Sequence, residues 1–190
     1  MPEYHYVSDD IFTVSEFFSR EECEQFIQLA ESHGFSDAPI NTPFGTEIRR
    51  DVRDNTRVMI DDPKLAAHLW GRVAEYMPAK LADSVPVGVN ERFRYYRYED
   101  GQQFNWHCDG YFERLNFERS RLTFMVYLND GFQGGQTSFE GHSIEPIAGM
   151  ALFFAHELVH KGQPVFKGRK YVLRTDVMFL HEKLTKFRKK

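Results

Sequence analysis

Cysteines and long apolar runs are scarce in this sequence. Its 190 residues include two cysteines, Cys23 and Cys108. That is too few for the disulfide framework of a small secreted domain, so a reducing compartment fits better. No apolar stretch approaches the roughly 20 residues that cross a bilayer. The first five residues are polar and do not resemble a secretory signal. We therefore expect a cytoplasmic protein that does not span a membrane.

Positive charge is also scarce, except at the C-terminus. The formal net charge is −4, yet residues 183–190 hold five cations: Lys183, Lys186, Arg188, Lys189 and Lys190. The rest of the chain has 19 basic residues against 28 acidic ones. This balance argues against nucleic-acid binding by the body of the protein. We expect the tail to be solvated, with contact to an acidic partner as the alternative.

Helix signals fall in the first part of the chain. Ser19 followed by Glu22 forms a capping box, and Gly34 is a natural end for the helix that it starts. Asp62-Pro63 opens a second helix, because an acid caps its N-terminus and proline suits its first position; Pro78 marks its end. We expect residues 1–80 to be the helical part of the domain.

Strand signals dominate the second half. Residues 92–98, 122–128, 151–154 and 171–179 are rich in β-branched or aromatic side chains and are separated by Gly, Asn and Pro. Aromatic residues make up 15% of the chain, which suits an aromatic sheet core. No internal repeat or linker divides the sequence. We expect one α+β domain over residues 1–190, with a mainly β core over about 85–181 and the tail over 183–190.

A group of potential metal ligands stands out within the strand region. His107 and Asp109 are two positions apart, so on a strand both side chains leave the same face. His160 follows the apolar stretch 151–154 and is the favoured third ligand; His156 is its rival. Two imidazoles and one carboxylate on one side of a metal leave the other side open. This arrangement suits iron(II) that must also bind a substrate and dioxygen.

Two cations interrupt the last apolar strand. Lys170 and Arg174 are four residues apart, so they face the same way on a strand. Cations inside an apolar strand are costly unless they meet an anion. A dicarboxylate cosubstrate would supply one.

Taken in order, these motifs resemble the iron(II)- and 2-oxoglutarate-dependent oxygenases, specifically their prolyl-4-hydroxylase-like branch. The matching stretches are residues 17–23, Tyr98-x-x-Gly101, His107-x-Asp109, residues 121–130, Gly134-Gly135-Gln136-Thr137, and His160 with Pro164-Val165, Gly168 and Lys170. The resemblance implies a double-stranded β-helix, or jelly roll, with N-terminal helices buttressing one sheet.

The resemblance also implies roles for individual residues. His107, Asp109 and His160 match the iron ligands, and Lys170 matches the residue that grips the distal carboxylate of 2-oxoglutarate. Other branches place a carboxylate-binding arginine near the position of Arg174, so the two cations remain joint candidates, with Lys170 preferred. Two tyrosines, Tyr98 and Tyr127, match residues that hydrogen-bond 2-oxoglutarate.

Strand parity adds candidates for contact with the main substrate. Arg94 and Tyr96 share the face of Tyr98, and Met125, together with Thr123, shares the face of Tyr127. Trp106 and Cys108 flank the iron motif and should point away from it into packing, so we assign them no chemistry.

The implied activity is that of a dioxygenase. An oxidoreductase of this kind hydroxylates a C–H bond with Fe(II), 2-oxoglutarate and O2, releases succinate and CO2, and uses ascorbate as reductant. A peptidyl residue such as proline and a small molecule are both open as substrates. Loops at residues 37–57 and 110–120 are candidates to hold the substrate. The first contains Arg49, Arg50 and Arg53, which could grip an anion or belong to a balanced ion-pair surface.

Two other classes of function are open. One is a non-oxidative, cupin-like metalloenzyme; Lys170 and Arg174 argue against it, because such an enzyme needs no oxoglutarate clamp. The other is a binding or sensor module without turnover; the intact ligand triad argues against that.

Overall fold

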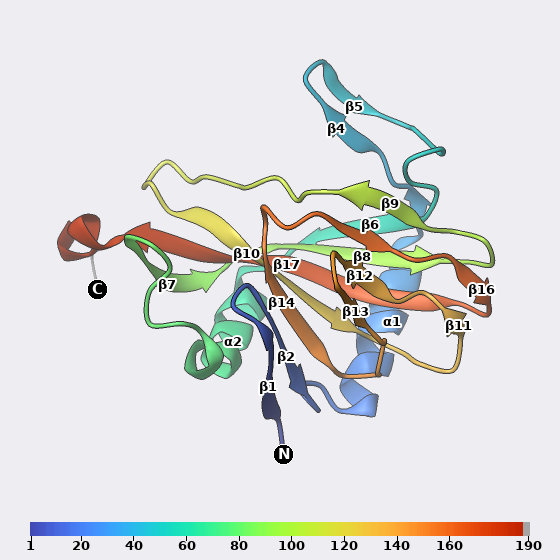
Figure 1. Ribbon diagram of the computed structural model, residues 1–190, viewed down its shortest axis with the longest axis horizontal. Coiled ribbons are helices and arrows are strands. Elements are labelled where there is room, and N and C mark those ends of the chain that lie inside the picture. Colours follow the sequence, from blue (N-terminus) through green and yellow to red (C-terminus); the bar gives the residue numbers. More distant parts are fainter. Residues whose placement is uncertain (188–190) are drawn as a thin grey trace.

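The computed structural model describes residues 1–187 and has a jelly-roll core of two facing sheets (Figure 1). The larger sheet has the strand order β1-β2-β14-β10-β17-β8-β6-β3, and β7 also pairs with β17. Its strands are β1 (Glu3–Ser8), β2 (Ile11–Ser15), β3 (Ser36–Asp37), β6 (Thr56–Asp61), β7 (Ser84–Val89), β8 (Arg92–Tyr98), β10 (Arg119–Tyr127), β14 (Ala151–Ala155) and β17 (Lys170–His181).

The smaller sheet lies opposite and has the order β13-β12-β15-β9. Its strands are β9 (Phe104–His107), β12 (Thr137–Phe139), β13 (His142–Ile144) and β15 (His160–Gly162). Two short pairs complete the strands: β4 (Ile40–Thr42) with β5 (Gly45–Glu47), and β11 (Gln133–Gly134) with β16 (Val165–Lys167). The β4–β5 hairpin projects from the body of the molecule (Figure 1).

Both helices predicted from capping signals are present. Helix α1 spans Arg20–His33, and the reciprocal hydrogen bonds of the capping box join Ser19 and Glu22. Helix α2 spans Pro63–Val73, continues as a 3-10 turn over Ala74–Tyr76, and is capped by Asp62. The helices lie on the outer face of the larger sheet (Figure 1), as the jelly-roll expectation required.

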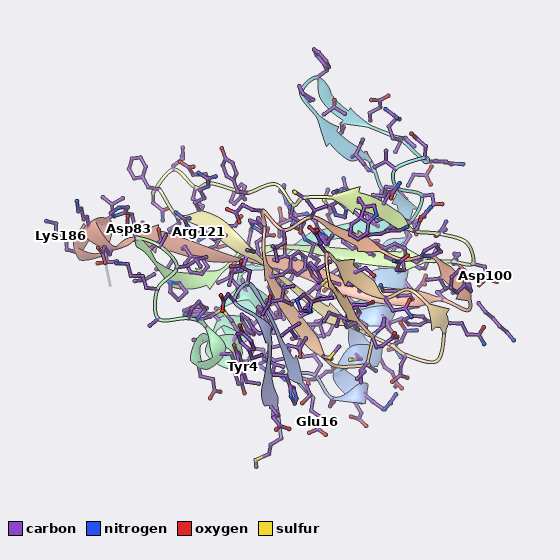
Figure 2. The ribbon with its side chains drawn as sticks, viewed as in Figure 1. Tyr4, Glu16, Asp83, Asp100, Arg121 and Lys186 are labelled. Carbon is purple, nitrogen blue, oxygen red and sulfur yellow. The ribbon has the colours of Figure 1, made fainter. Side chains whose placement is uncertain are left out.

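Alternation along the central strands divides the core into two layers. On β8, Phe93 and Tyr95 join the cluster that packs under the helices, whereas Tyr96 and Tyr98 join the cluster between the sheets. Side chains crowd the centre of the molecule in projection (Figure 2). The face of β8 that carries Tyr96 and Tyr98 therefore borders the interior of the jelly roll.

The N-terminal part differs from the expected helical segment over 1–80, because β1 to β6 also begin there. The stretch Ile11-Phe12-Thr13-Val14 is buried because β2 pairs with β14, far along the chain. Such pairing leaves no local capping signal in the sequence.

The basic tail begins in a 3-10 helix over Glu182–Phe187, at one extreme of the molecule, where Figure 2 shows Lys186. Arg188, Lys189 and Lys190 lie outside the described residues. Within residues 1–187, no helix combines the length and apolar character needed to span a bilayer.

Candidate active site

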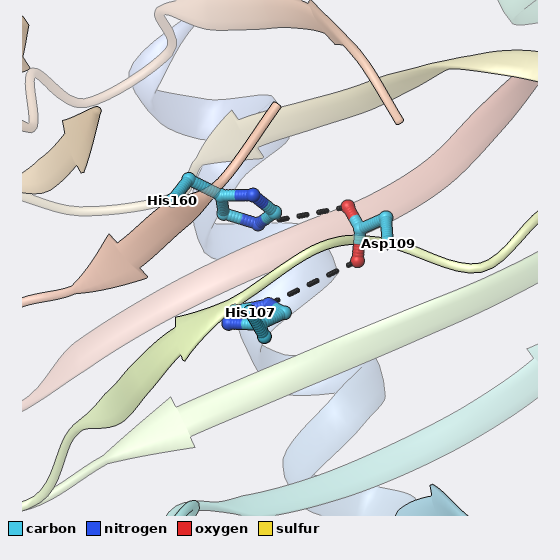
Figure 3. A group of neighbouring side chains, drawn as sticks. All are labelled: His107, Asp109 and His160. Carbon is cyan, nitrogen blue, oxygen red and sulfur yellow. Dashed lines mark ion pairs between the residues drawn. The ribbon is translucent and has the colours of Figure 1, made fainter. Parts of the chain in front are cut away.

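The structure brings His107, Asp109 and His160 together inside the jelly roll (Figure 3). His107 ends β9 and lies in register with His160, the first residue of β15. Asp109 follows two residues after His107, and its two oxygens lie 3.9 Å from His107 Nε2 and 3.7 Å from His160 Nε2. One potential ligand atom from each residue falls within 4.8 Å of the others. A single metal ion can therefore contact all three.

Both imidazoles are oriented by backbone carbonyls. His107 Nδ1 donates to Asn105 O at 2.7 Å, and His160 Nδ1 donates to Leu158 O at 2.9 Å. Each Nε2 is thus left as the metal-binding nitrogen. Burial lowers the pKa of His107 to about 4, and it also lowers the pKa of His160. Both rings are therefore neutral at physiological pH, the form that binds Fe(II), so the donor set fits this metal.

Asp109 is held from the side of the larger sheet. Thr123 Oγ1 donates to Asp109 Oδ2 at 2.5 Å, and Arg174 Nη2 lies 3.1 Å from the same oxygen. Burial alone would favour the neutral acid. However, the Arg174 guanidinium above all, helped by the hydrogen bond from Thr123, outweighs burial and holds the pKa of Asp109 well below its usual range. The third ligand is therefore an oriented carboxylate anion.

Arg174 has two carboxylate partners of its own. Besides Asp109, its Nη2 lies 3.0 Å from Asp176 Oδ1. Burial opposes the charge, but both carboxylates raise the pKa of this guanidinium. We had expected Arg174 to share the cosubstrate carboxylate with Lys170. The structure instead places its charge against protein carboxylates, one of them a candidate metal ligand.

The charge of Lys170, unlike that of Arg174, is not neutralised by a described carboxylate. It is 3% exposed, its Nζ donates to Gly135 O at 2.5 Å, and no carboxylate among the described residues forms an ion pair with it. Burial lowers its pKa to about 7. Gly135 has a positive φ, and a Cβ there would lie 2.9 Å from the Phe132 ring and 3.1 Å from the Lys170 stem, so this position favours glycine.

The two tyrosines predicted to bind 2-oxoglutarate flank Lys170. Its Nζ lies 5.2 Å from the ring centroid of Tyr98 and 5.3 Å from that of Tyr127. The Tyr127 hydroxyl donates to Thr137 Oγ1 at 2.7 Å. The Tyr98 hydroxyl forms no hydrogen bond to another described residue, so it remains available to a ligand.

A cavity connects the triad to Lys170. Its lining residues come from both sheets: Tyr96, Tyr98, Phe104, His107, Asp109, Thr123, Met125, Thr137, Phe154, His160, Gly162, Lys170, Val172 and Arg174. One cavity thus holds the metal-binding side chains at one place and, at another, a buried cation that no described carboxylate pairs with.

The three candidate substrate contacts are placed differently. Tyr96 and Met125 line the cavity. Arg94 does not; its Nη1 lies 3.4 Å from Asp176 Oδ2, and it borders a neighbouring depression that also contains Phe112 and Arg114. Arg94 therefore lies beside the metal-binding cavity, on the same sheet face.

His156, the rival third ligand, is not part of the triad. Its Nδ1 lies 3.0 Å from Thr123 Oγ1 and its Nε2 lies 2.9 Å from Ser120 Oγ. Both ring nitrogens of His156 thus form hydrogen bonds with hydroxyl groups, and one of these, that of Thr123, also donates to Asp109.

The expectation that Trp106 and Cys108 point into packing is wrong, since Trp106 is 50% exposed and Cys108 is also exposed. The short β9 strand has its outer face in solvent.

Two neighbours of the triad were missed by sequence reasoning. Phe104 stacks on the His107 ring with centroids 3.5 Å apart. Arg53 lies in turn against Phe104, with its guanidinium carbon 4.3 Å from that ring centroid. Arg53 belongs to a segment already noted for its cations, but spacing alone did not separate it from Arg49 and Arg50.

Comparison with known proteins supports this description. Residues 93–175 match the model of the 2OG-Fe(II) oxygenase superfamily. Probable prolyl 4-hydroxylase 3 of Arabidopsis thaliana is 25% identical over 195 residues, covering 84% of this chain and 66% of the plant protein. This chain therefore spans just under two thirds of that relative's length.

Solved structures share the fold. A viral collagen prolyl hydroxylase from Paramecium bursaria Chlorella virus-1, in complex with 2OG, aligns with a TM-score of 0.66 and 21% identity, covering 90% of this chain and 97% of the viral one. A Trichoplax adhaerens prolyl hydroxylase, bound to a hypoxia inducible factor peptide fragment, aligns with a TM-score of 0.68 and 17% identity, covering 96% and 89%. At these identities the likeness supports the jelly-roll fold.

Proposed function

We propose that this chain, which belongs to the 2OG-Fe(II) oxygenase superfamily, is a prolyl-4-hydroxylase-like dioxygenase that hydroxylates a C–H bond with Fe(II), 2-oxoglutarate and O2. One observation carries the proposal: a facial set of two histidines and one aspartate shares a cavity with a buried lysine that has no carboxylate partner within residues 1–187. A cupin-like enzyme without a dicarboxylate cosubstrate would have no use for such a lysine.

The protein's part in the reaction is to bind, orient and exclude water. His107, Asp109 and His160 would hold Fe(II) from one side and leave the other side open, and the bound iron activates dioxygen for C–H oxidation. Lys170 would bind the distal carboxylate of 2-oxoglutarate, with Tyr98 beside it. Phe104, together with other aromatic residues of the cavity, keeps water from the reacting groups.

The substrate that this proposal favours is a prolyl residue of a peptide or a related compound. The relatives include plant prolyl 4-hydroxylases, and one structural neighbour is bound to a peptide of the hypoxia inducible factor. The exposed rings of Phe44 on the β4–β5 hairpin and of Tyr111 and Phe117 in the loop after β9 offer apolar surface at two projecting segments. A peptide would have such surface to contact on either side of the β9 strand.

The test is a turnover assay. Purified protein is incubated with Fe(II), ascorbate and labelled 2-oxoglutarate, and succinate is counted with and without a library of proline-containing peptides and amino acids. We expect succinate above the level of a His107→Ala control and a mass increase of one oxygen atom in a library member. Succinate that never exceeds the control would refute the proposal.

A further inference from the structure

Among the described residues most arginines are paired with carboxylates, and two that are not, Arg53 and Arg57, lie beside Tyr96, a wall of the active-site cavity. In the segment before β6, Arg49 pairs with Asp51 and Arg50 pairs with Asp37, each at 2.7 Å. Arg53 and Arg57, in the same part of the chain, form no ion pair with any described carboxylate. Neither cation therefore has a counterion among the described residues.

Arg53 is buried between the two sheets. It is 5% exposed, and its guanidinium carbon lies 4.4 Å from the Tyr96 ring centroid and 4.3 Å from that of Phe104. Its Nε donates to Asn55 Oδ1 at 2.6 Å, but its Nη2 is buried without a hydrogen-bond partner among the described residues. Tyr96 and Phe104 both line the cavity. The unpartnered nitrogen thus belongs to a side chain that touches two walls of the site.

Arg57 lies beside the same tyrosine on the larger sheet, and it lines a separate depression with Asp37 and Thr46 rather than the active-site cavity itself. It lies opposite Tyr96 in the β6–β8 register, and directly opposite residues of antiparallel strands share a face. It is only partly exposed. Burial lowers its pKa, and the positive charges of Arg53 and Arg94 lower it further. Like charges therefore crowd around Tyr96, just outside the lining of the active-site cavity.

The other charges around the cavity are already accounted for. Arg174 is balanced by Asp109 and Asp176, and Asp176 also faces Arg94. Lys170 is assigned to 2-oxoglutarate under the proposed function. Arg53 and Arg57 remain, although the chain as a whole is acidic. Two partly or fully buried cations without a counterion are costly unless a ligand supplies the negative charge.

We propose that the substrate to be hydroxylated carries a carboxylate, which binds Arg53 and Arg57 beside Tyr96. This inference rests on the proposed function and narrows its substrate class to acidic compounds: an acidic peptide residue next to the hydroxylated one, or a small carboxylic acid. Guanidinium groups suit a carboxylate because they can donate two parallel hydrogen bonds to it. Tyr96 between them would place that carboxylate next to the metal-binding cavity.

The experiment compares matched probes that differ only in the negative charge. Protein loaded with Fe(II) and 2-oxoglutarate is kept anaerobic, so that binding is measured by calorimetry without turnover. One pair is N-acetylproline and N-acetylprolinamide; the other is the blocked peptide Ala-Glu-Pro-Ala and its Ala-Gln-Pro-Ala counterpart. Since hydrogen bonds between charged groups are stronger than those between neutral groups, we expect the carboxylate member of at least one pair to bind roughly tenfold tighter or more. Which pair responds distinguishes a small acid from an acidic peptide.

Variants assign the effect to the two arginines. In the Arg53→Gln, Arg57→Gln double variant the preference should fall below about twofold, and Arg57→Lys should retain part of it because the charge is kept. Arg49→Gln and Arg50→Gln are matched controls, since both arginines are exposed and already paired; they should keep the preference. Circular dichroism checks that every variant is folded.

Several outcomes would overturn the inference. Equal affinities within both pairs would do so, as would a preference that survives the double variant or an absence of binding by both carboxylates at 20 mM. These outcomes leave the proposed function intact if the wild-type protein still forms succinate. Conversely, a clear carboxylate preference without any succinate would contradict the proposed function alone.

Discussion

Lys170 and Arg174 lie four residues apart on β17 and face the same cavity, yet their surroundings are opposite. Arg174 meets two protein carboxylates within 3.1 Å, whereas Lys170 meets a backbone carbonyl and two aromatic rings. Their pKa values accordingly move in opposite directions, raised for the arginine and lowered for the lysine.

This difference separates a structural charge from a binding charge. A buried cation with two protein carboxylates is neutralised before any ligand arrives, so it orients those carboxylates. A buried cation without one is a cost to the unliganded fold and a gain when an anion binds. Spacing along the strand made the two residues look equivalent; their partners make them different.

The largest expected effect is on stability, at Arg174. Replacing it in Arg174→Gln leaves the largely buried Asp109 without a cation and Asp176 with Arg94 alone, and removal of one partner from a buried pair costs about 3–5 kcal/mol. We expect the free energy of unfolding in urea to fall by about that amount and iron affinity to fall with it. An unchanged urea midpoint combined with weaker 2-oxoglutarate binding would return Arg174 to the role of cosubstrate clamp.

The opposite behaviour is expected at Lys170. In Lys170→Met the dissociation constant for 2-oxoglutarate, measured anaerobically with Fe(II), should rise about 10- to 100-fold, the equivalent of one charged hydrogen bond. The unliganded variant should melt at a higher temperature, because a desolvated cation has been removed. Lys167→Met, at an exposed lysine on β16, is the matched control and should change neither quantity. A lower melting temperature with unchanged affinity would remove Lys170 from the site.

The pH dependence follows from the same lysine. Its pKa is about 7 in the unliganded fold and near 10.5 when unfolded, so the unfolded chain holds more protons between these values. The destabilisation by Lys170 is therefore complete below pH 7 and fades as the pH rises toward 10.5. Lys170→Met should accordingly stabilise the protein most at pH 6 and hardly at all above pH 10.5.

Binding of 2-oxoglutarate should show the complementary trend, because only protonated Lys170 pairs with a carboxylate. The dissociation constant should be nearly constant below pH 7 and rise roughly tenfold between pH 7 and 8.5. In Lys170→Arg the cation stays charged throughout, so any binding that remains should lose this dependence. A wild-type profile as flat as that of the arginine variant would contradict the assignment.

Local signals explain which parts of the fold were predictable. The capping box at Ser19 and the N-cap at Asp62 are each contained within a few residues, and both helices follow. The buried β2 strand was missed because its stability comes from pairing with β14. Its partner lies more than a hundred residues away, and no short pattern encodes that distance.

In the candidate site, too, residues within a short local pattern were predictable and residues brought in from distant segments were not. The two-residue spacing of His107 and Asp109, together with the family motifs, was sufficient to predict which three residues form the triad. Asp176 lies two residues after Arg174 and shares its strand face, so one partner of this arginine was within reach of the same reasoning. Arg53 was not, because its position between Tyr96 and Phe104 depends on the path of a loop.

The smallest expected effects concern the tyrosines beside Lys170 and test the same contrast on hydroxyl groups. The Tyr127 hydroxyl is occupied by Thr137, so Tyr127→Phe should lower the free energy of unfolding by about 1 kcal/mol and change 2-oxoglutarate affinity little. The Tyr98 hydroxyl has no partner among the described residues, so Tyr98→Phe should leave unfolding nearly unchanged and weaken 2-oxoglutarate binding roughly 2- to 10-fold. Urea unfolding and anaerobic calorimetry on both variants measure the two effects. The opposite result, in which Tyr127→Phe weakens 2-oxoglutarate binding and Tyr98→Phe does not, would make Tyr127 the tyrosine that binds the cosubstrate. A hydroxyl that is already hydrogen-bonded within the fold would then still be able to bind the ligand.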